Sequence, residues 1–327
     1  SYQEMIITEL HKGQGLGNQL WCYCVCRSIA DELDVPYKIL GSGNFKAKDF
    51  LDIDFGDASS IDEKYTIFHE QRFYDKQLDY VASSFDDRVL SLDQGTQIEG
   101  LFQSEKYFFD NIDRLKEYIK IQEEYKNLIT IPNDVCILNI RGGEYKRYKR
   151  FNLPKSYWVN AMNSMKHKYG IKKFMVVTDD HDYAKALFPD IKIVKSGISE
   201  SYIALHNTSF LIVSNSTFSY FPIKTKGEKP VVIAPKYFAR FNDKLDKWAS
   251  PANIYKDWLW LDRDGKLYTY DVCIEEVEEL DFMYKNEYYI LTNQEAINKK
   301  NLIYYIPASV KKKLKLILSK VFPRNFG

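Results

Sequence analysis

At 327 residues the chain is too long for a single small core, and its 46 lysines and arginines nearly balance its 45 aspartates and glutamates. The length predicts two domains or one large α/β domain, and the net charge of +1 excludes a protein whose overall charge would attract nucleic acid. No uninterrupted apolar run approaches the roughly 20 residues that a membrane span requires.

The first predicted element is a strand over Met5 to Leu10, which leads into the glycine loop HKGQGLGNQ and then a helix over Leu20 to Leu33. A strand, a glycine loop and a helix typically bind an anion, because the first N–H groups of the helix point at the ligand. The spacing Gly13-x-Gly15-x-Gly17 differs from the G-x-G-x-x-G of dinucleotide folds, so a nicotinamide enzyme is disfavoured. A tight turn would explain these glycines equally well.

Two amides, Asn18 and Gln19, follow the glycines directly. Each can donate and accept hydrogen bonds, so both are candidates for binding a ligand. The alternative for Asn18 is that it only caps the helix.

The five cysteines make an odd count, and Cys22, Cys24 and Cys26 alternate along this predicted helix. Their side chains would diverge, which argues against a disulfide framework and favours a reducing compartment. The spacing does not match the paired ligands of a zinc site. The start of the sequence also lacks a signal-peptide pattern, so we expect a cytoplasmic protein without a metal site.

The middle of the chain has a less regular pattern. A second strand is predicted over Tyr37 to Leu40, and a helix near Asn111 to Tyr125. The turn residues Pro132-Asn133-Asp134 then interrupt the chain. We place a domain boundary there, which predicts an N-terminal domain over residues 1–130 and a second domain over residues 131–300.

Strands and helices alternate regularly after this boundary. Strands are predicted over Val135 to Leu138, Lys173 to Thr178, Ile191 to Val194, Ser209 to Val213 and Val231 to Ala234. Helices are predicted over Pro154 to Tyr169, His181 to Leu187 and Ser201 to His206. This alternation predicts a doubly wound parallel sheet.

Polar loops follow three of these strands, at Arg141, at Asp179-Asp180 and at Ser214 in the run SNSTFS. Loops at the carboxyl ends of parallel strands share one edge of the sheet, where ligands bind. A cation and hydroxyls there would bind the phosphates of a nucleotide, and a carboxylate would bind its base or ribose. Alternatively, Arg141 lies in a solvated surface turn, the aspartates cap a helix, and SNSTFS is an ordinary loop.

The last segment, residues 301–327, differs from the rest. Between Pro307 and Pro323, apolar residues follow a helical period and five lysines lie largely around them. Such a helix can dock on an anionic membrane. The alternative is a terminal helix that packs on the body of the protein.

With these motifs assembled, the sequence resembles the bacterial α1,2-fucosyltransferases of glycosyltransferase family 11, and more distantly the wider fucosyltransferase superfamily. The glycine loop through Leu20 is similar to the family's Gly-x-x-Asn-Gln loop, and residues 139–145 are similar to its His-x-Arg-Arg-x-Asp signature. Residues 178–180 and 214–220 resemble its Ser/Thr-Asp-Asp and Asn-Ser-Ser/Thr-Phe-Ser-Trp segments. Here Asn139, Gly142 and Glu144 replace the His, the second Arg and the Asp of the signature.

The resemblance implies an α/β protein of GT-B architecture, with two Rossmann-like domains facing across a cleft. It implies inverting transfer of fucose from GDP-fucose to a hydroxyl, O2 of a terminal galactose, without a cofactor or metal. The lysine-rich tail suggests that the acceptor is a surface glycan precursor at the inner membrane face. Arg141 would bind the β-phosphate, and Asn139 with Asp179 or Asp180 would bind guanosine. The pyrophosphate would contact residues of the serine-rich turn, Ser214, Ser216, Thr217, Phe218 and Ser219. The donor sugar and acceptor would contact His11, Gly15, Gly17, Asn18 and Gln19.

An inverting transfer also benefits from a base beside the acceptor hydroxyl. Glu144 is the first candidate, and Glu9 or His11 the second. Three Asp-x-Asp pairs start at Asp52, Asp180 and Asp262, but such pairs arise by chance among 45 acidic residues. Two other functions stay open, namely transfer from another nucleotide sugar and a non-catalytic nucleotide- or glycan-binding protein docked on the inner membrane by its tail.

Overall fold

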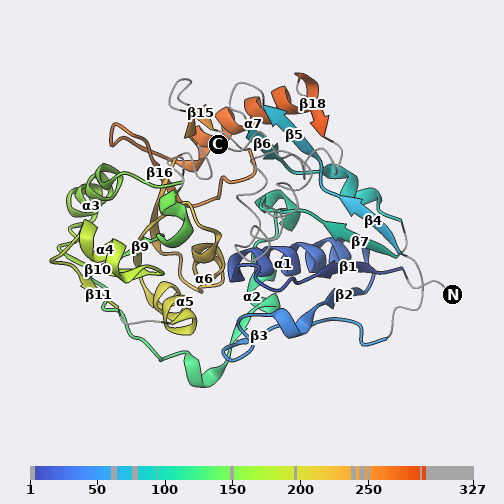
Figure 1. The fold of residues 1–327 in the computed structure, drawn as a ribbon, viewed down its shortest axis with the longest axis horizontal. Helices are drawn as coiled ribbons and strands as arrows, with labels where there is room; N and C mark the ends of the chain where they lie inside the picture. Colours follow the sequence, from blue (N-terminus) through green and yellow to red (C-terminus); the bar gives the residue numbers. More distant parts are fainter. Residues whose placement is uncertain are drawn as a thin grey trace, which may run out of the picture.

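Two parallel sheets organise the two halves of the molecule (Figure 1). The computed structural model describes residues 4–59, 65–75, 80–93, 95–147, 151–194, 197–236, 241–242, 247–248, 251–287 and 289–291. The segment 301–327, with its predicted membrane-docking helix, lies outside these residues.

The first sheet has four parallel strands in the order β2-β1-β7-β4. They are β1 (Ile6–Glu9), β2 (Tyr37–Leu40), β4 (Thr66–His69) and β7 (Thr96–Glu99). The strand predicted over Tyr37 to Leu40 is confirmed at both ends. Strand β1 is one residue shorter at each end than predicted.

Helix α1 (Leu16–Leu33) connects β1 to β2 and starts at Leu16 rather than at the predicted Leu20. Gly15 is its N-cap, so Asn18 lies inside the first turn and does not cap the helix. The helix is buried on nearly every side, because it packs against β1 and also contacts α6 (Tyr220–Lys224) of the second half. All five cysteines of the chain, three of them on α1, are free and buried.

The second sheet has the strand order β11-β10-β9-β12-β13-β16-β17. Its strands are β9 (Val135–Ile140), β10 (Lys173–Thr178), β11 (Lys192–Ile193), β12 (Phe210–Val213), β13 (Val231–Pro235), β16 (Leu259–Leu261) and the antiparallel edge strand β17 (Leu267–Tyr268). Counted along the chain from β9, the six parallel strands stand in the order 3-2-1-4-5-6, which is the doubly wound order. The predicted parallel sheet is therefore confirmed.

Helices α3 (Lys155–Tyr169), α4 (His181–Leu187) and α5 (Ile198–Asn207) connect the strands of this sheet, close to their predicted positions. Pro154 is the N-cap of α3, and Gly170 ends it with a φ of 67°. The first predicted strand of this half extends two residues further, to Ile140, and all six residues of β9 are buried. Arg141 therefore lies at the carboxyl end of the central strand.

The helix predicted near Asn111 to Tyr125 is wrong. Only α2 (Arg114–Tyr118) is helical there, and β8 (Lys120–Ile121) and the 3₁₀ helix η4 (Glu123–Tyr125) follow it. Ile119 is extended at the end of α2, and β8 pairs with β3 (Leu51–Asp52). Pairing with a distant strand overrides the local helical preference.

The chain returns to its first half near the end of the described residues. Helix α7 (Tyr270–Glu287) contacts β5 (Arg72–Asp75), and β18 (Tyr289–Leu291) pairs with β5, which also pairs with β6 (Tyr80–Ser83) (Figure 1). Tyr284 of α7 stacks on Phe73 at 5.9 Å and donates a hydrogen bond to Asp75. The predicted division of the chain at residues 131–300 stays a prediction, and α7 contacts both β5 of the first half and β16 of the second.

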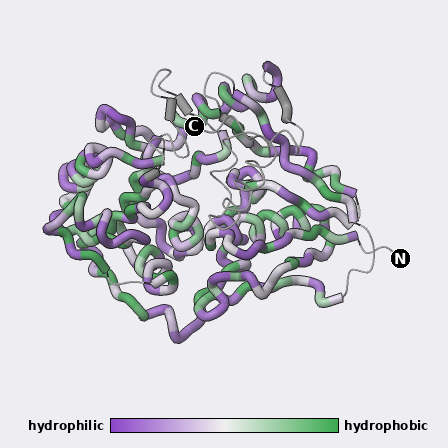
Figure 2. The backbone as a smooth tube through the Cα atoms, in the orientation of Figure 1, coloured by the Kyte–Doolittle hydropathy of each residue, from purple (hydrophilic) through white to green (hydrophobic). Residues whose placement is uncertain are grey.

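The two halves share a hydrophobic core. Trp21 of α1 has no exposed area, and its ring lies 4.4 Å from that of Tyr220 and 5.9 Å from that of Tyr255. In Figure 2 the hydrophobic colour runs along α1 and the strands beside it, whereas the loop at the bottom of the view is hydrophilic. Among the described residues, no helix has both the length and the apolar character needed to cross a bilayer.

Candidate active site

A pocket of about 500 Å³ lies between the two halves, at the carboxyl ends of β1, β9, β10 and β12. Strand order in the second sheet reverses between β9 and β12, and ligands bind at such switch points in doubly wound sheets. The predicted site residues that line the pocket are Gly15, Gly17, Asn18, Asn139, Arg141, Glu144, Asp179, Ser216, Thr217 and Phe218. The structure thus brings together the three polar loops and the glycine loop.

Arg141 enters the pocket from the end of β9. Its Nη1 pairs with Oδ2 of Asp179, and its guanidinium lies 4.9 Å from the ring centre of Tyr145. Oδ1 of Asp179 accepts a hydrogen bond of 2.8 Å from the N–H of Gly142. Both charged side chains are about one-third exposed, at 33% and 32%, so the pair remains accessible to a ligand.

Asp180 also binds the loop that follows Arg141, but it does not line the pocket. Its carboxylate caps α4 by accepting from the N–H of Tyr183, accepts from the N–H of Gly143, and pairs with Lys146 at 2.6 Å. The hydrogen bond from Lys146 lowers the pKa of the Asp180 carboxyl. For Asp180, the helix-capping alternative is therefore what the structure shows.

Gly142 occupies the position where the family signature has its second arginine. A Cβ added at Gly142 would lie 2.6 Å from the Cβ of Asp180 and 2.9 Å from the ring of Tyr183. No side chain fits there without moving the start of α4. The absence of the second arginine is therefore part of how this loop packs.

The glycine loop and the serine-rich turn touch across the pocket. A Cβ added at Gly17 would lie 2.5 Å from Oγ1 of Thr217 and 2.7 Å from its carbonyl oxygen. Oδ1 of Asn18 accepts a hydrogen bond of 3.0 Å from Oγ1 of Thr217. Two motifs that are 199 positions apart in the chain thus form one wall of the pocket.

Some of the other residues of the serine-rich turn line the pocket, and the rest lie inside the protein. Ser216 caps the 3₁₀ helix η6 (Thr217–Ser219) by accepting from the N–H of Phe218. Ser214 and Ser219 are buried, at 2% and 1% exposed, and neither lines the pocket. Asn215 lines it and donates to the carbonyl of Phe151.

Gln103 lines the pocket although no sequence pattern indicated it. Its Nε2 donates to Oδ1 of Asn18 at 3.0 Å, and its Oε1 accepts from Nδ2 of Asn253 at 3.3 Å. Gln103 therefore connects the glycine loop to the segment that precedes β16.

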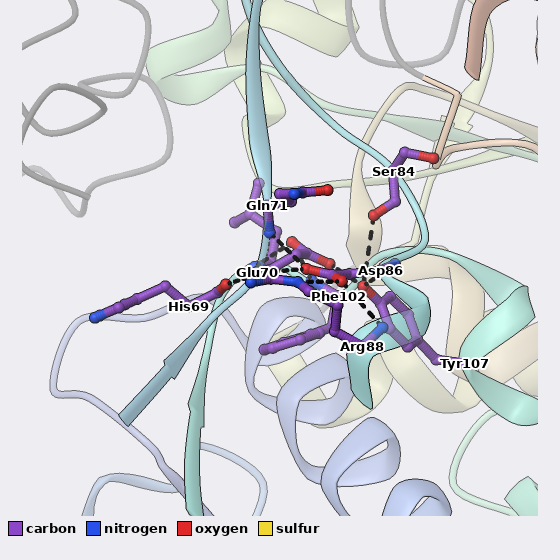
Figure 3. Close-up of polar contacts among 9 residues, drawn as sticks. His69, Glu70, Gln71, Ser84, Asp86, Arg88, Phe102 and Tyr107 are labelled. Carbon is purple, nitrogen blue, oxygen red and sulfur yellow. Dashed lines mark hydrogen bonds and ion pairs between the residues drawn. The ribbon is translucent and has the colours of Figure 1, made fainter. Parts of the chain in front are cut away.

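The loop that carries Gln103 is braced by a buried carboxylate, Glu70 (Figure 3). Oε1 of Glu70 accepts from the N–H groups of Leu101 and Phe102, and its Oε2 accepts from the hydroxyl of Tyr107 at 2.6 Å. Tyr107 in turn accepts from the N–H of Asp86. Burial raises the pKa of Glu70 to about 7, so this brace titrates near neutral pH.

Gln19 is fully buried and does not line the pocket. Its Nε2 donates to the carbonyl of Asn44 at 2.8 Å, and its Oε1 accepts from the N–H of Lys46 at 3.0 Å. Lys46, which no sequence pattern indicated, lines the pocket. Partial desolvation at the pocket first, and the charge of Arg141 second, lower the pKa of the Lys46 ammonium.

Glu144, the first candidate for a base, lines the pocket beside Arg141. The second candidates, Glu9 and His11, do not line it. Asn139 lines it and donates through Nδ2 to the carbonyl of Val177, so its amide is tied to the neighbouring strand.

The Asp-x-Asp pairs lie outside the pocket. Asp54 forms a turn with the N–H of Gly56, Asp180 caps α4, and Asp262 accepts from the N–H groups of Asp264 and Lys266 in the β16–β17 hairpin. Among the described residues, no cluster of three or more His, Cys, Asp or Glu side chains could hold a metal ion.

Two facing parallel α/β sheets, with a pocket between them at the switch point of the second, form a GT-B architecture. The profile of Glycosyl transferase family 11 matches residues 55–262. The chain belongs to this family, as its motifs predicted. The predicted enzyme class, a glycosyltransferase, is confirmed.

Solved structures with similar folds include the fucosyltransferase NodZ from Bradyrhizobium, at 13% identity and a TM-score of 0.42, with 68% of this chain and 93% of that chain covered. A POFUT1 structure in complex with GDP-fucose has 10% identity and a TM-score of 0.43, with coverage of 72% and 98%. A family 9 glycosyl transferase from Veillonella parvula DSM 2008 has 10% identity and a TM-score of 0.38, with coverage of 86% and 97%. Among curated protein sequences, none matches the chain.

Proposed function

We propose that the protein transfers fucose from GDP-fucose to a glycan hydroxyl, with inversion at the anomeric carbon and without a metal. The observation that carries this proposal is the position of Arg141, which enters the switch-point pocket opposite the glycine loop and the serine-rich turn. Membership of family 11 and the motif resemblance support fucose as the sugar.

In the proposed reaction, the bond between the anomeric carbon and the β-phosphate oxygen breaks while the acceptor oxygen attacks from the opposite face. Negative charge then develops on the leaving diphosphate, and Arg141 stabilises it. A guanidinium that Asp179 already orients needs little rearrangement when that charge develops. Ser216 and Thr217, which also line the pocket, are proposed to contact the rest of the diphosphate.

The acceptor hydroxyl, which we propose to be O2 of a terminal galactose, loses its proton as it attacks. Glu144 is the proposed base, because its side chain lines the same pocket as Arg141. Gly17 and Asn18 face this region from the other half and are proposed to contact the sugar and the acceptor.

A panel of donors tests the proposal. Incubation with GDP-fucose, GDP-mannose, UDP-galactose or dTDP-rhamnose, together with lactose as acceptor, should release nucleotide and form product only with GDP-fucose. Arg141→Ala should lower turnover about a hundredfold or more while the melting temperature changes little. Retained turnover in Arg141→Ala would remove Arg141 from the mechanism.

Two further measurements separate the finer parts of the proposal. NMR of the product should show an α-linkage from the β-linked donor sugar, which defines inversion. Turnover should persist after dialysis against a chelator, because the proposed mechanism routes no step through a metal. An inactive chelated enzyme that magnesium or manganese restores would overturn the metal-free part alone.

A different nucleotide-sugar donor is the second candidate, and Gly142 favours it, because this site lacks the second arginine of the signature. The same panel decides between the two, since the other donor would release its own nucleotide. We also propose a surface glycan precursor at the cytoplasmic face of a membrane as the acceptor. Flotation of the full chain with anionic vesicles, against a chain that ends at Tyr305, tests the membrane contact.

A further inference from the structure

Lys46 lies on the loop between β2 and β3, on the side of the pocket that belongs to the first half. Its neighbours in the chain, Phe45 and Ala47, are buried at 3% and 0% exposed, so the backbone on both sides is anchored in the core. The Lys46 side chain is exposed and reaches the pocket from a rigid base.

Gln19 holds this base in place. It is 0% exposed and uses both ends of its amide on this loop, at Asn44 and at the N–H of Lys46. Asn44 is itself held by a hydrogen bond of 3.0 Å from its Nδ2 to the carbonyl of Leu10. The start of α1, which contacts Thr217 through Gly17, thus also positions Lys46.

The charges of the two cations at the pocket are balanced differently. Arg141 has Asp179 as its counter-ion, whereas the Lys46 ammonium has no ion pair or hydrogen-bond partner within the described ranges. Lys46 and Arg141 line the same pocket, and the positive charge of Arg141 contributes to the lowered pKa of Lys46. Two cations that converge on one pocket from opposite halves, one without a counter-ion, are the arrangement that a multiply charged anion stabilises.

We propose that Lys46 is a second diphosphate-binding residue, which contacts the donor's diphosphate from the first half while Arg141 contacts it from the second. This inference rests on the proposed function and deepens it. The family signature carries two arginines on one loop, but Gly142 here has no room for a side chain beside Asp180. Lys46 supplies the missing positive charge from the other side of the pocket, so the diphosphate bridges the two halves.

The test measures binding of inorganic pyrophosphate, GDP and GMP by calorimetry to the full chain and to three variants. Lys46→Met should weaken pyrophosphate and GDP about tenfold, because it removes a charge-assisted contact, and should weaken GMP less. Lys46→Arg should restore most of the affinity. Lys48→Met is the matched control, because Lys48 lies on the same loop, donates to the carbonyl of Gly43 and does not line the pocket.

Melting temperatures should agree among all four proteins, since the Lys46 side chain is exposed. Pyrophosphate that binds Lys46→Met as tightly as the unmodified protein, or that does not bind the unmodified protein, would overturn the inference about Lys46. The proposed donor is tested separately, by comparing the affinity of the unmodified protein for GDP with its affinities for UDP and dTDP. Equal affinity for the three nucleotides, together with weaker pyrophosphate binding in Lys46→Met, would refute the guanosine donor and keep the role of Lys46.

Discussion

Gly17 lies directly against the backbone of Thr217, so closely that a single added carbon at Gly17 would overlap Thr217 at 2.5 Å. The first residue belongs to α1 and the second to the turn after β12, and both line the pocket. The close approach explains why a glycine is required at this position. It also makes the contact between the two halves sensitive to one methyl group.

Gly17→Ala should therefore push the two halves apart. We expect a loss of about 1–3 kcal/mol in the free energy of unfolding, which is typical of overpacking. Transfer activity should also fall, because the contact forms one wall of the pocket. Gly15→Ala is the control, because nothing lies within 4 Å of an added Cβ there and its φ of −64° suits any residue. Denaturant unfolding measures the stability of both variants, and an assay of fucose transfer measures their activity. Equal stability of Gly17→Ala and Gly15→Ala would contradict the contact between Gly17 and Thr217.

The hydrogen bond between Asn18 and Thr217 should be detectable as an energetic coupling. Asn18→Ala and Thr217→Val each remove one partner, and the double variant should destabilise by about 1 kcal/mol less than the sum of the two. Thr225→Val, which removes the hydrogen bond from Oγ1 of Thr225 to the carbonyl of Phe221, should add to Asn18→Ala without coupling. Strict additivity of the first pair would show that the hydrogen bond contributes nothing.

Asp179 and Asp180 are adjacent but have different partners, and this predicts different effects. Asp179→Asn removes the charge that orients Arg141 and should lower kcat/KM about tenfold, with weaker pyrophosphate binding. Asp180→Asn should keep most activity, because asparagine caps α4 equally well.

The sequence-based prediction that one of these aspartates binds guanosine has its own signature. If Asp179 has that role, Asp179→Asn should weaken GDP but leave pyrophosphate binding unchanged. The structure gives Asp179 two partners in the Arg141 loop, so we expect both ligands to weaken.

Glu70 predicts a pH dependence of stability. Burial raises its pKa from 4.5 to about 7, so the folded state holds a proton that the unfolded chain has released over this range. The contribution of Glu70 to the free energy of unfolding is therefore fully present below pH 4.5. About 3 kcal/mol of it is lost as the pH rises to about 7. Glu70→Gln keeps the hydrogen-bonding shape and should remove this loss.

The measurement is urea unfolding of both proteins at several pH values. The free energy of unfolding of Glu70→Gln minus that of the unmodified protein should rise between pH 4.5 and 7 and then level off. A difference that stays constant over this range would mean that Glu70 is ionised in the fold. At neutral pH the loop that carries Gln103 should therefore be more stable in Glu70→Gln than in the unmodified protein.

The amino-acid sequence by itself determined the second sheet and the polar loops at its edge. The runs ending at Leu138, Thr178 and Val213 are apolar, β-rich and followed by polar residues, and this local pattern is enough to predict a parallel sheet and its ligand edge. Arg141 and the glycine loop were predicted because each motif is contiguous in the chain.

Only the tertiary structure decided which residues share the pocket and which support it from inside. Gln103 reaches the pocket on a loop that Glu70 holds by hydrogen bonds across 31 or more positions of the chain. Lys46 reaches it on a loop that Gln19 holds by a hydrogen bond across 27 positions. No local pattern encodes such contacts. Asp180 and Gln19 look like ligand-binding residues in the sequence, but each uses its hydrogen bonds within the protein. Pairing between β3 and β8 likewise ends the predicted helix early, so that only α2 is α-helical there. In each case the deciding interaction joins residues that are distant in the chain. It contributes to stability only once the fold has brought those residues together.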